Sequence, residues 1–253
     1  MIREFIDNLE PAHIALPVLH SCSVRTLEEI LSTRVLKPQP CSIFKSENLL
    51  YMYYGKPSYR IKSNDSHSEI GFFPSCFIFK MPNEKPIKTF PFDSGIFEKD
   101  EEFRNKYFSI ESKIKDFLLS NDILTAQKIV NYFYENNRNY YRSMPKHLDI
   151  PQHLFDVKYY YNLITSKDNS KYDDRMSSIE FAFDNPIHLD ETNLLGVILP
   201  ALYLDRVEYL LSDLFNSVFV KAYESARGNP SHYHGNIHDS VYNFLSTNNY
   251  FEH

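Results

Sequence analysis

Apolar and polar side chains alternate around Glu180, and this pattern marks a strand. Ile179, Phe181 and Phe183 occupy every second position, with Glu180 and Ala182 between them. A period of two predicts a β-strand with one apolar face. Glu180 then projects from the opposite face of a well-buried strand. Because an ionised carboxylate is costly to bury unless it is paired or used in chemistry, Glu180 is the first candidate functional residue.

The N-terminal part of the chain predicts strands that flank one short helix. Residues 14–20 form an apolar run that ends in His20. Ser23 is typical of a helix N-cap, and apolar residues follow it at helical spacing. These apolar positions are Val24, Leu27, Ile30 and Leu31. Further apolar and aromatic runs at 49–54 and 72–81 predict two more strands.

From about residue 100 the apolar period becomes that of helices. Residues 101–119 place apolar side chains on one face, which predicts an amphipathic helix. Asn121 or Asp122 could cap a second helix that continues to Phe133. The spacing of apolar residues also predicts a helix over 206–223.

The order of elements predicts an α+β fold. Strands come first, helices follow, and a strand at 194–199 and a short helix at 240–245 come late in the chain. We find no internal repeat, low-complexity tract or linker. We therefore expect a single domain over 1–253, with a helical insertion at about 100–165.

Composition and charge narrow the functional classes. Hydrophobic residues make up 43% and charged residues 24% of the 253 residues, which is typical of a globular protein. The formal net charge of −6 argues against a general basic coat for nucleic acid, although a local basic groove is compatible with it. Only six glycines are present, and no phosphate-loop, dinucleotide-fingerprint, nucleophile-elbow or zinc-protease motif occurs.

Cysteine usage and the absence of long apolar runs predict a cytoplasmic protein. The three cysteines are scattered without a CxxC pair, which favours reduced thiols. Charged residues interrupt the first apolar positions, so we expect no signal peptide. No apolar run approaches the length of a membrane span, so we expect no membrane association through such a span.

Several residue types near the predicted strand ends suit a nucleotide. A histidine such as His20 can donate a hydrogen bond to a ribose hydroxyl, and Ser21 can bond a carboxamide or another hydroxyl. A tyrosine such as Tyr59 can stack on a planar ring, and Arg60 can hold a pyrophosphate. Glu180 can stabilise a ribosyl oxocarbenium ion and accept a proton from the attacking group. The working hypothesis is a nucleotide-handling site built from His20, Tyr59 and Glu180.

These residues give the sequence a resemblance to a known family. His20-Ser21, the aromatic run that leads to Tyr59, and the Arg175…Ile179-Glu180 segment resemble the ADP-ribosyltransferases of the His-Tyr-Glu class. Within that class the pattern is most similar to DarT-type toxins that modify nucleic acid and to related antiphage toxins that modify RNA. The segment 90–95 (Phe-Pro-Phe-Asp-Ser-Gly) also resembles a loop of such proteins. The resemblance covers about residues 14–95 and 172–200.

The resemblance implies a fold and an activity. It implies a split β-sheet core and NAD as the ADP-ribose donor, with the ADP-ribose passed to RNA or single-stranded DNA. It implies a toxin or antiphage effector that an antitoxin or inhibitor protein restrains. Ser178 stands two residues before Glu180, where arginine-modifying relatives carry a carboxylate, so arginine is not the expected acceptor.

The resemblance also implies roles for individual residues. His20 and Ser21 would anchor the nicotinamide riboside end of NAD, and Glu180 would be the catalytic residue. Tyr59 would flank the nicotinamide, and two other tyrosines remain alternatives for that role. These alternatives are Tyr51 and Tyr54. Arg60 would lie near the phosphates of NAD.

A mixed aromatic and basic stretch is the candidate acceptor-binding region. Residues 138–161 interleave tyrosines with basic residues, and such a mixture can stack bases and neutralise phosphates. The candidate contacts are Arg138, Tyr141, Arg142 and Lys146. The alternative interpretation is a tyrosine-rich surface packed under a pair of helices. Two other functions stay open: an ADP-ribosyltransferase that acts on a protein, and a catalytically inactive module that binds NAD or nucleic acid.

Three histidines near the C-terminal end are candidate metal ligands. His232, His234 and His238 lie in a segment that we expect to be a loop, with no cysteine nearby. Their spacing does not match a zinc signature, so we predict no metal site.

Overall fold

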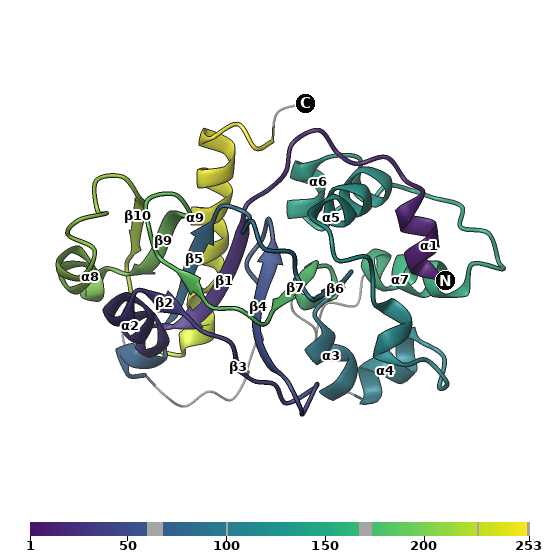
Figure 1. Ribbon diagram of the computed structural model, residues 1–253, viewed down its shortest axis with the longest axis horizontal. Helices are drawn as coiled ribbons and strands as arrows, with labels where there is room; N and C mark the ends of the chain where they lie inside the picture. The colour runs from purple at the N-terminus through teal and green to yellow at the C-terminus, as the bar shows by residue number, and fades with distance from the viewer. Residues whose placement is uncertain (60–67, 100, 167–173, 227, 252–253) are drawn as a thin grey trace.

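A β-sheet forms the centre of the protein, and helices pack around it (Figure 1). The computed structural model describes residues 1–59, 68–99, 101–166, 174–226 and 228–251. Its main strands are β1 (Val18–Ser23), β3 (Gln39–Pro40), β4 (Asn48–Tyr54), β5 (Pro74–Phe79), β6 (Lys88–Phe90), β7 (Glu180–Phe183), β9 (Leu194–Pro200) and β10 (Phe219–Tyr223). They run in the order β10-β9-β5-β1-β4-β7-β6, with β3 paired to β4. Two short strands, β2 (Val35–Leu36) and β8 (Ile187–His188), pair separately.

The sheet is mostly antiparallel, which confirms the α+β class. Among the described neighbouring strands from β10 to β6, only β9 and β10 run parallel. Parallel pairs need a crossover, and the segment between β9 and β10 supplies it through η5 (Ala201–Tyr203) and α8 (Leu204–Leu210). The finer prediction, a fold of the ADP-ribosyltransferase type, is taken up below as a proposal.

The sheet opens between two of its central strands. β1 pairs with β4 only at Val18 with Tyr54 and Leu19 with Tyr53. Beyond these pairs β1 continues along β5 to Ser23, whereas β4 continues along β7. His20 is the first residue of β1 past the opening. His20 therefore lies just beyond the last residue pair between β1 and β4.

Helices are the other regular elements of the described chain. The α-helices other than α8 are α1 (Ile2–Asp7), α2 (Val24–Thr33), α3 (Ser94–Lys99), α4 (Glu101–Tyr107), α5 (Ile123–Ile129), α6 (Asn137–Tyr141), α7 (Phe155–Thr165) and α9 (His234–Thr247). Short 3₁₀ turns are η1 (Ile70–Phe72), η2 (Ile114–Phe117), η4 (Asp174–Met176) and η6 (Pro230–Tyr233), and η3 (Val130–Tyr134) is a π-helical turn. α2 packs on β1 and β5, while α9 packs on β5, β9 and β10. The predicted cap of α2 is confirmed, because the Ser23 hydroxyl accepts a hydrogen bond from the amide of Thr26.

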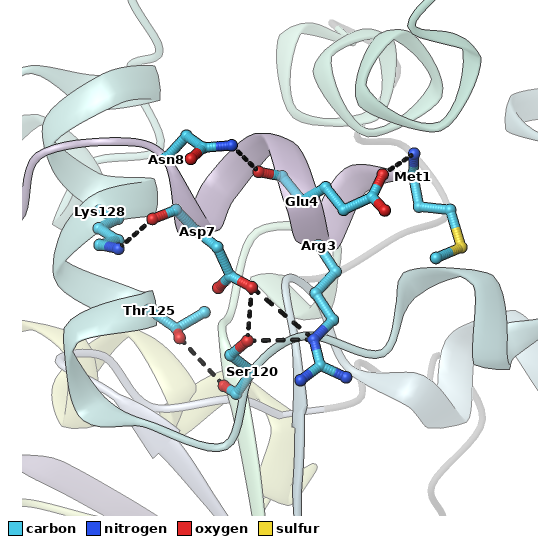
Figure 2. Close-up of polar contacts among 8 residues, drawn as sticks. All are labelled: Met1, Arg3, Glu4, Asp7, Asn8, Ser120, Thr125 and Lys128. Carbon is cyan, nitrogen blue, oxygen red and sulfur yellow. Dashed lines mark hydrogen bonds and ion pairs between the residues drawn. The ribbon is translucent and has the colours of Figure 1, made fainter.

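The N-terminal helix belongs with the predicted insertion (Figure 1). Figure 2 shows Lys128 of α5 donating to the Asp7 carbonyl at 2.6 Å, and the Ser120 hydroxyl donating to the Asp7 carboxylate at 2.8 Å. Arg3 Nε also donates to Ser120 Oγ at 3.1 Å. α1 and α3 to α7 therefore form one helical unit, which was not expected from the sequence, where residues 1–13 stand far from the insertion.

The predicted helix over 206–223 is wrong in its second half. α8 ends at Leu210, turns follow, and residues 219–223 form β10 alongside β9. The apolar spacing suited a helix, but Phe219, Val220 and Tyr223 have high strand propensity. Because β9 would otherwise be an open edge, pairing there satisfies backbone groups that a helix would not.

Other predicted boundaries also change. The helix predicted at 101–119 stops at Tyr107, and Ile110, which we expected on its apolar face, is 88% exposed. The second helix begins as predicted, with the Asp122 carboxylate accepting from the amide of Leu124. The short helix expected at 240–245 extends over the whole of α9, so the segment with His234 and His238 is helical rather than a loop.

The buried apolar residues form one contiguous cluster that spans the sheet and the helical unit. Side chains from Ile2 to Phe251 contribute to it. No helix in the described part of the chain is long and apolar enough to cross a membrane.

Candidate active site

Glu180 is the first residue of β7, the strand next to β6 at one end of the sheet, and its carboxyl group is buried. Its strand neighbours are Tyr53 on β4 and Phe90 on β6, and residues paired in this way share one face of a sheet. Glu180 is only 1% exposed. Its Oε2 accepts a hydrogen bond from the amide of Ser94 at 3.2 Å. Oε1 has no hydrogen-bond partner among the described residues.

A second carboxylate, Asp93, lies beside Glu180. The Tyr53 hydroxyl donates to Asp93 Oδ2 at 3.0 Å, and the amide of Gly95 donates to Oδ1 at 2.7 Å. The amide of Asp93 donates to the carbonyl of Arg175 at 3.0 Å, which fixes the loop against the segment before β7. Burial, and then the negative charge of Asp93, raise the pKa of Glu180 well above its ordinary value. The loop at 90–95 thus contributes both a carboxylate and an amide to the site.

A cavity of about 390 Å³ opens beside these carboxyl groups. Tyr51, Tyr53, Ser58, Arg175 and Glu180 are among the residues that line it. The Ser58 hydroxyl is buried and, like Glu180 Oε1, has no partner within the described ranges. Buried polar atoms are nearly always hydrogen-bonded in folded proteins. Two unpaired oxygens at one cavity therefore indicate a place for a ligand with polar groups.

His20 uses one ring nitrogen to bridge the opening in the sheet. Its Nδ1 lies 3.0 Å from the carbonyl oxygen of Tyr51, which can only accept, so Nδ1 carries the proton. Burial lowers the pKa of His20, which favours the neutral ring. Nε2 is then an acceptor, and no hydrogen bond to it is found in the described structure.

His20 borders a second cavity that adjoins the first. This cavity has a volume of about 380 Å³ and lies between α2 and β4. Tyr51 lines both cavities, as do Gln39 and Leu49. The two spaces therefore meet at Tyr51, with His20 in the second and Glu180 in the first.

The other predicted nucleotide-binding residues lie apart from Glu180. The Ser21 hydroxyl accepts from the amide of Ser58 at 3.2 Å, so Ser21 reaches the cavity wall only through Ser58. The Tyr59 ring stacks on His234 with centroids 4.3 Å apart, and its hydroxyl donates to the carbonyl of Ser75. Tyr59 is not among the residues that line the two cavities. Tyr54 is fully buried. Arg60 lies outside the residues that the structure describes.

The predicted acceptor-binding residues mostly contact the C-terminal part of the chain. The Tyr141 ring is 9% exposed and its hydroxyl donates to the carbonyl of His238 in α9. Arg142 donates to the Tyr242 hydroxyl. The other two lie over aromatic rings: Arg138 over Phe251 and Lys146 over Tyr132. None of the four lines either cavity. The buried Tyr141 ring is not presented for base stacking, and this agrees with the alternative interpretation of packing under helices.

Sequence reasoning gave no role to several residues of the cavity. In the sequence, Asp93 stands in the segment 90–95, and Tyr53 stands in the apolar and aromatic run at 49–54; neither context assigns a role to the side chain. The Asp-Ser-Gly sequence could have predicted a helix cap, since Asp93 accepts from the amide two residues later at the start of α3. Cys41 also lines the cavity, and its sequence context carries no signal for that position.

A buried lysine connects the helical unit to the segment before β7. Lys56 is 1% exposed, and its ammonium group donates to Ser177 Oγ at 2.6 Å and to Ser143 Oγ at 2.9 Å. Gly55, at a φ of 67°, makes the turn that directs it there, and a Cβ at Gly55 would clash with Leu16. Burial lowers the pKa of Lys56 to about 8.

We expect Lys56 to give unfolding a distinctive pH dependence. Because its pKa in the folded protein is about 8 and its ordinary value is 10.5, the unfolded chain binds more protons between these values. The free energy of unfolding of the wild type, relative to Lys56→Met, should therefore rise by about 3 kcal/mol from pH 8 to 10.5. Urea unfolding at a series of pH values measures the difference. The exposed Lys45→Met variant controls for the loss of a surface charge, and a wild-type-minus-Lys56→Met difference that stays constant across this range would contradict the prediction.

Two of the three C-terminal histidines contact other residues of the protein. His238 Nε2 lies 2.7 Å from the carboxylate of Asp174, and His234 stacks on Tyr59. No group of three or more histidine, cysteine, aspartate or glutamate side chains that could hold a metal ion is found among the described residues.

Comparisons of the chain with protein families, with curated proteins and with solved structures found no match.

Proposed function

We propose that the protein is an NAD-dependent ADP-ribosyltransferase that transfers ADP-ribose to RNA or single-stranded DNA. One observation carries the proposal: adjacent strands β1, β4 and β7 bring His20, Tyr51 and Glu180 to two adjoining cavities. A histidine, a tyrosine and a glutamate in this chain order also carry the resemblance to the His-Tyr-Glu class. The opening of the sheet at His20 agrees with the split core that the resemblance implies.

The residues around the cavities fit the chemical groups of NAD. Glu180 Oε1 and the Ser58 hydroxyl have no hydrogen-bond partner in the part of the chain that the structure describes, and both can bond sugar hydroxyls or a carboxamide. His20 Nε2 can accept from a ribose hydroxyl. Arg175 lines the first cavity and Lys37 the second, so cations are present at both for phosphate groups. In this arrangement Tyr51 takes the stacking role, because it lines both cavities and Tyr59 lines neither.

The buried carboxyl groups supply the chemistry. NAD supplies an activated ribose, whose bond to the positively charged nicotinamide ring breaks so that the electron pair leaves with the ring. Glu180, when ionised, stabilises the positive charge that develops on the ribose. Glu180 then accepts the proton that the acceptor loses as it bonds to the ribose carbon. Asp93 adds negative charge nearby and holds Tyr53 in place.

A partition experiment tests the proposal. The protein is incubated with NAD labelled in the ADP-ribose part, together with RNA, single-stranded DNA and a protein extract, which are then separated. We expect label in nucleic acid, and none with Glu180→Gln. Label found in protein alone would show that the acceptor of ADP-ribose is a protein. Free nicotinamide without a labelled acceptor would indicate NAD hydrolysis. No turnover by the wild type under any condition would overturn the proposed enzyme and leave a binding module.

The biological role follows from the resemblance alone. A transferase that modifies nucleic acid would act as a toxin or antiphage effector, and a cell that makes it would need an antitoxin or inhibitor protein. Separate expression of the wild type and of a catalytically impaired variant compares growth directly: the wild type should arrest growth, and Glu180→Gln should not.

The raised pKa of Glu180 predicts how turnover depends on pH. Glu180 acts in its ionised form, and burial beside Asp93 shifts ionisation to higher pH. We therefore expect turnover to fall as pH decreases through a range well above the ordinary glutamate pKa, and to recover when pH is raised. Initial rates of nicotinamide release from pH 5 to 9 measure the profile. A rate that stays constant down to pH 5 would exclude this role for Glu180.

A further inference from the structure

Cys41 places a sulfur atom in the wall of the Glu180 cavity. It follows β3, and its amide donates to the carbonyl of Glu47, which closes the loop 41–47. Two contacts hold this loop over the sheet. The ring of Phe44 stacks on Phe90, and the carboxylate of Glu47 pairs with Lys88 at 2.7 Å. Because the loop is held in this way, the position of the sulfur atom is fixed relative to β6 and β7.

Hydrogen-bond donors converge on this sulfur atom. The amides of Ile43 and Phe44 donate to Cys41 Sγ at 3.3 and 3.2 Å. The Tyr51 hydroxyl lies 2.9 Å from it and can donate a third hydrogen bond once the sulfur is a thiolate, which can only accept. Donors around a sulfur atom stabilise the negative charge of a thiolate when it forms, and the thiolate is the nucleophilic form.

The other two cysteines provide an internal contrast. Cys76 is fully buried, and burial raises the pKa of both the Cys22 and the Cys76 thiols. Neither lines the cavity of Glu180. Cys41 is partly exposed and shares the cavity with Glu180 and Ser58. Both of these are more than nine-tenths buried, and each has an oxygen without a partner among the residues described.

We propose that Cys41 is a site of covalent modification by soft electrophiles and by peroxide, and that its modification closes the cavity to its ligand. An alkyl halide reacts when the thiolate sulfur bonds to carbon and the halide leaves with the electron pair. Hydrogen peroxide oxidises the thiolate to a sulfenic acid: one oxygen bonds to sulfur, the O–O bond breaks, and the other oxygen leaves as water after protonation. Either product adds atoms within the cavity that Tyr51 and Glu180 also line. The closing of the cavity rests on the proposed function, whereas the reactivity of the thiol does not.

Limited labelling with iodoacetamide tests the reactive thiol. The folded protein is treated, quenched and digested, and the alkylated fraction of each cysteine is measured by mass spectrometry. We expect Cys41 to react at least about tenfold faster than Cys22 or Cys76. Tyr51→Phe, which removes one donor, should slow the reaction of Cys41. Reaction of Cys41 at or below the rate of Cys22 would overturn the proposal.

The closing of the cavity is tested on the same samples. NAD should protect Cys41 from alkylation, and alkylated wild type should lose NAD turnover in proportion to the alkylated fraction of Cys41. The NAD turnover of each variant after iodoacetamide treatment is compared with its own turnover before treatment. Cys41→Ser should therefore keep the turnover with which it started. Alkylated wild type with full turnover would overturn the closing of the cavity. Selective alkylation of Cys41 in a protein that does not turn over NAD would support the reactive thiol and overturn the proposed function alone.

Discussion

Glu180→Gln is expected to abolish ADP-ribose transfer while making the folded protein more stable near neutral pH. The amide keeps the shape of the carboxyl group and can still accept from the amide of Ser94. It cannot carry the negative charge that the developing ribosyl cation needs, nor accept the proton of the acceptor. Removal of one such electrostatic group typically costs about 10²–10³-fold in rate. Release of labelled nicotinamide measures this effect.

The gain in stability has a separate physical cause. The raised pKa of Glu180 means that folding opposes its ionisation, since the carboxylate is buried beside Asp93. Folded-state stability contributed by the protonated carboxyl is present at low pH and lost as pH rises towards the raised pKa. Glutamine does not ionise, so the free energy of unfolding of Glu180→Gln should exceed that of the wild type near pH 8, and the difference should shrink near pH 4. Thermal unfolding at the two pH values measures it.

A control variant distinguishes the effect of changing Glu180 from the effect of removing any one carboxylate. Glu84→Gln changes an exposed glutamate and should alter neither turnover nor stability by a measurable amount. A Glu180→Gln protein that keeps near wild-type turnover would remove Glu180 from the catalytic role. A Glu180→Gln protein that is less stable than the wild type at pH 8 would contradict the explanation that burial of the ionised carboxylate opposes folding.

Tyr140→Phe is expected to give the largest loss of stability from removal of a single oxygen atom. The Tyr140 hydroxyl is fully buried between β4 and the residue before β7. It donates to the carbonyl of Tyr54 at 2.8 Å and accepts from the amide of Ile179 at 3.1 Å. Phenylalanine leaves the amide of Ile179 without a partner, and a buried unsatisfied group costs about 1–3 kcal/mol. The carbonyl of Tyr54 loses one of its two hydrogen bonds and keeps the one from the amide of Lys56 at 2.9 Å. We expect a loss of about 1–3 kcal/mol in urea unfolding.

The same substitution should also lower NAD turnover. Ile179 precedes Glu180, so release of its amide lets the start of β7 move relative to β4. Tyr209→Phe is the matched control, because Tyr209 is 72% exposed and its hydroxyl has no buried backbone partner in the described structure. A Tyr140→Phe protein with the stability of Tyr209→Phe would show that water or a rearranged neighbour satisfies the amide of Ile179.

The strands that carry the candidate site could be predicted from the sequence, because short-range pattern determines them. The alternation around Glu180 predicted β7, and the cap at Ser23 predicted the start of α2 directly after His20. The sheet order could not be predicted in the same way. It depends on which strands pair, and the pairing of Tyr53 with Glu180 joins residues that are distant in the chain.

The choice of tyrosine shows where local pattern stops being informative. Tyr51, Tyr53, Tyr54 and Tyr59 stand within nine residues and look alike in sequence. Their surroundings differ through long-range contacts: Tyr53 bonds to Asp93, and Tyr59 stacks on His234. β10 was missed for a related reason, since its helical spacing was overridden by the free edge of β9.

The attachment of α1 to α5 has a consequence for synthesis on the ribosome. Asp7 and Lys128 lie 121 residues apart in the chain, so at about 5–20 residues per second α1 waits roughly 6–24 seconds for its partner. β7 is made later still, so His20 and Tyr51 emerge long before Glu180 can join them. A nascent chain therefore has no complete cavity during most of its translation. Under the proposed function, that interval would give a restraining protein time to bind the growing chain before the proposed catalytic centre is complete.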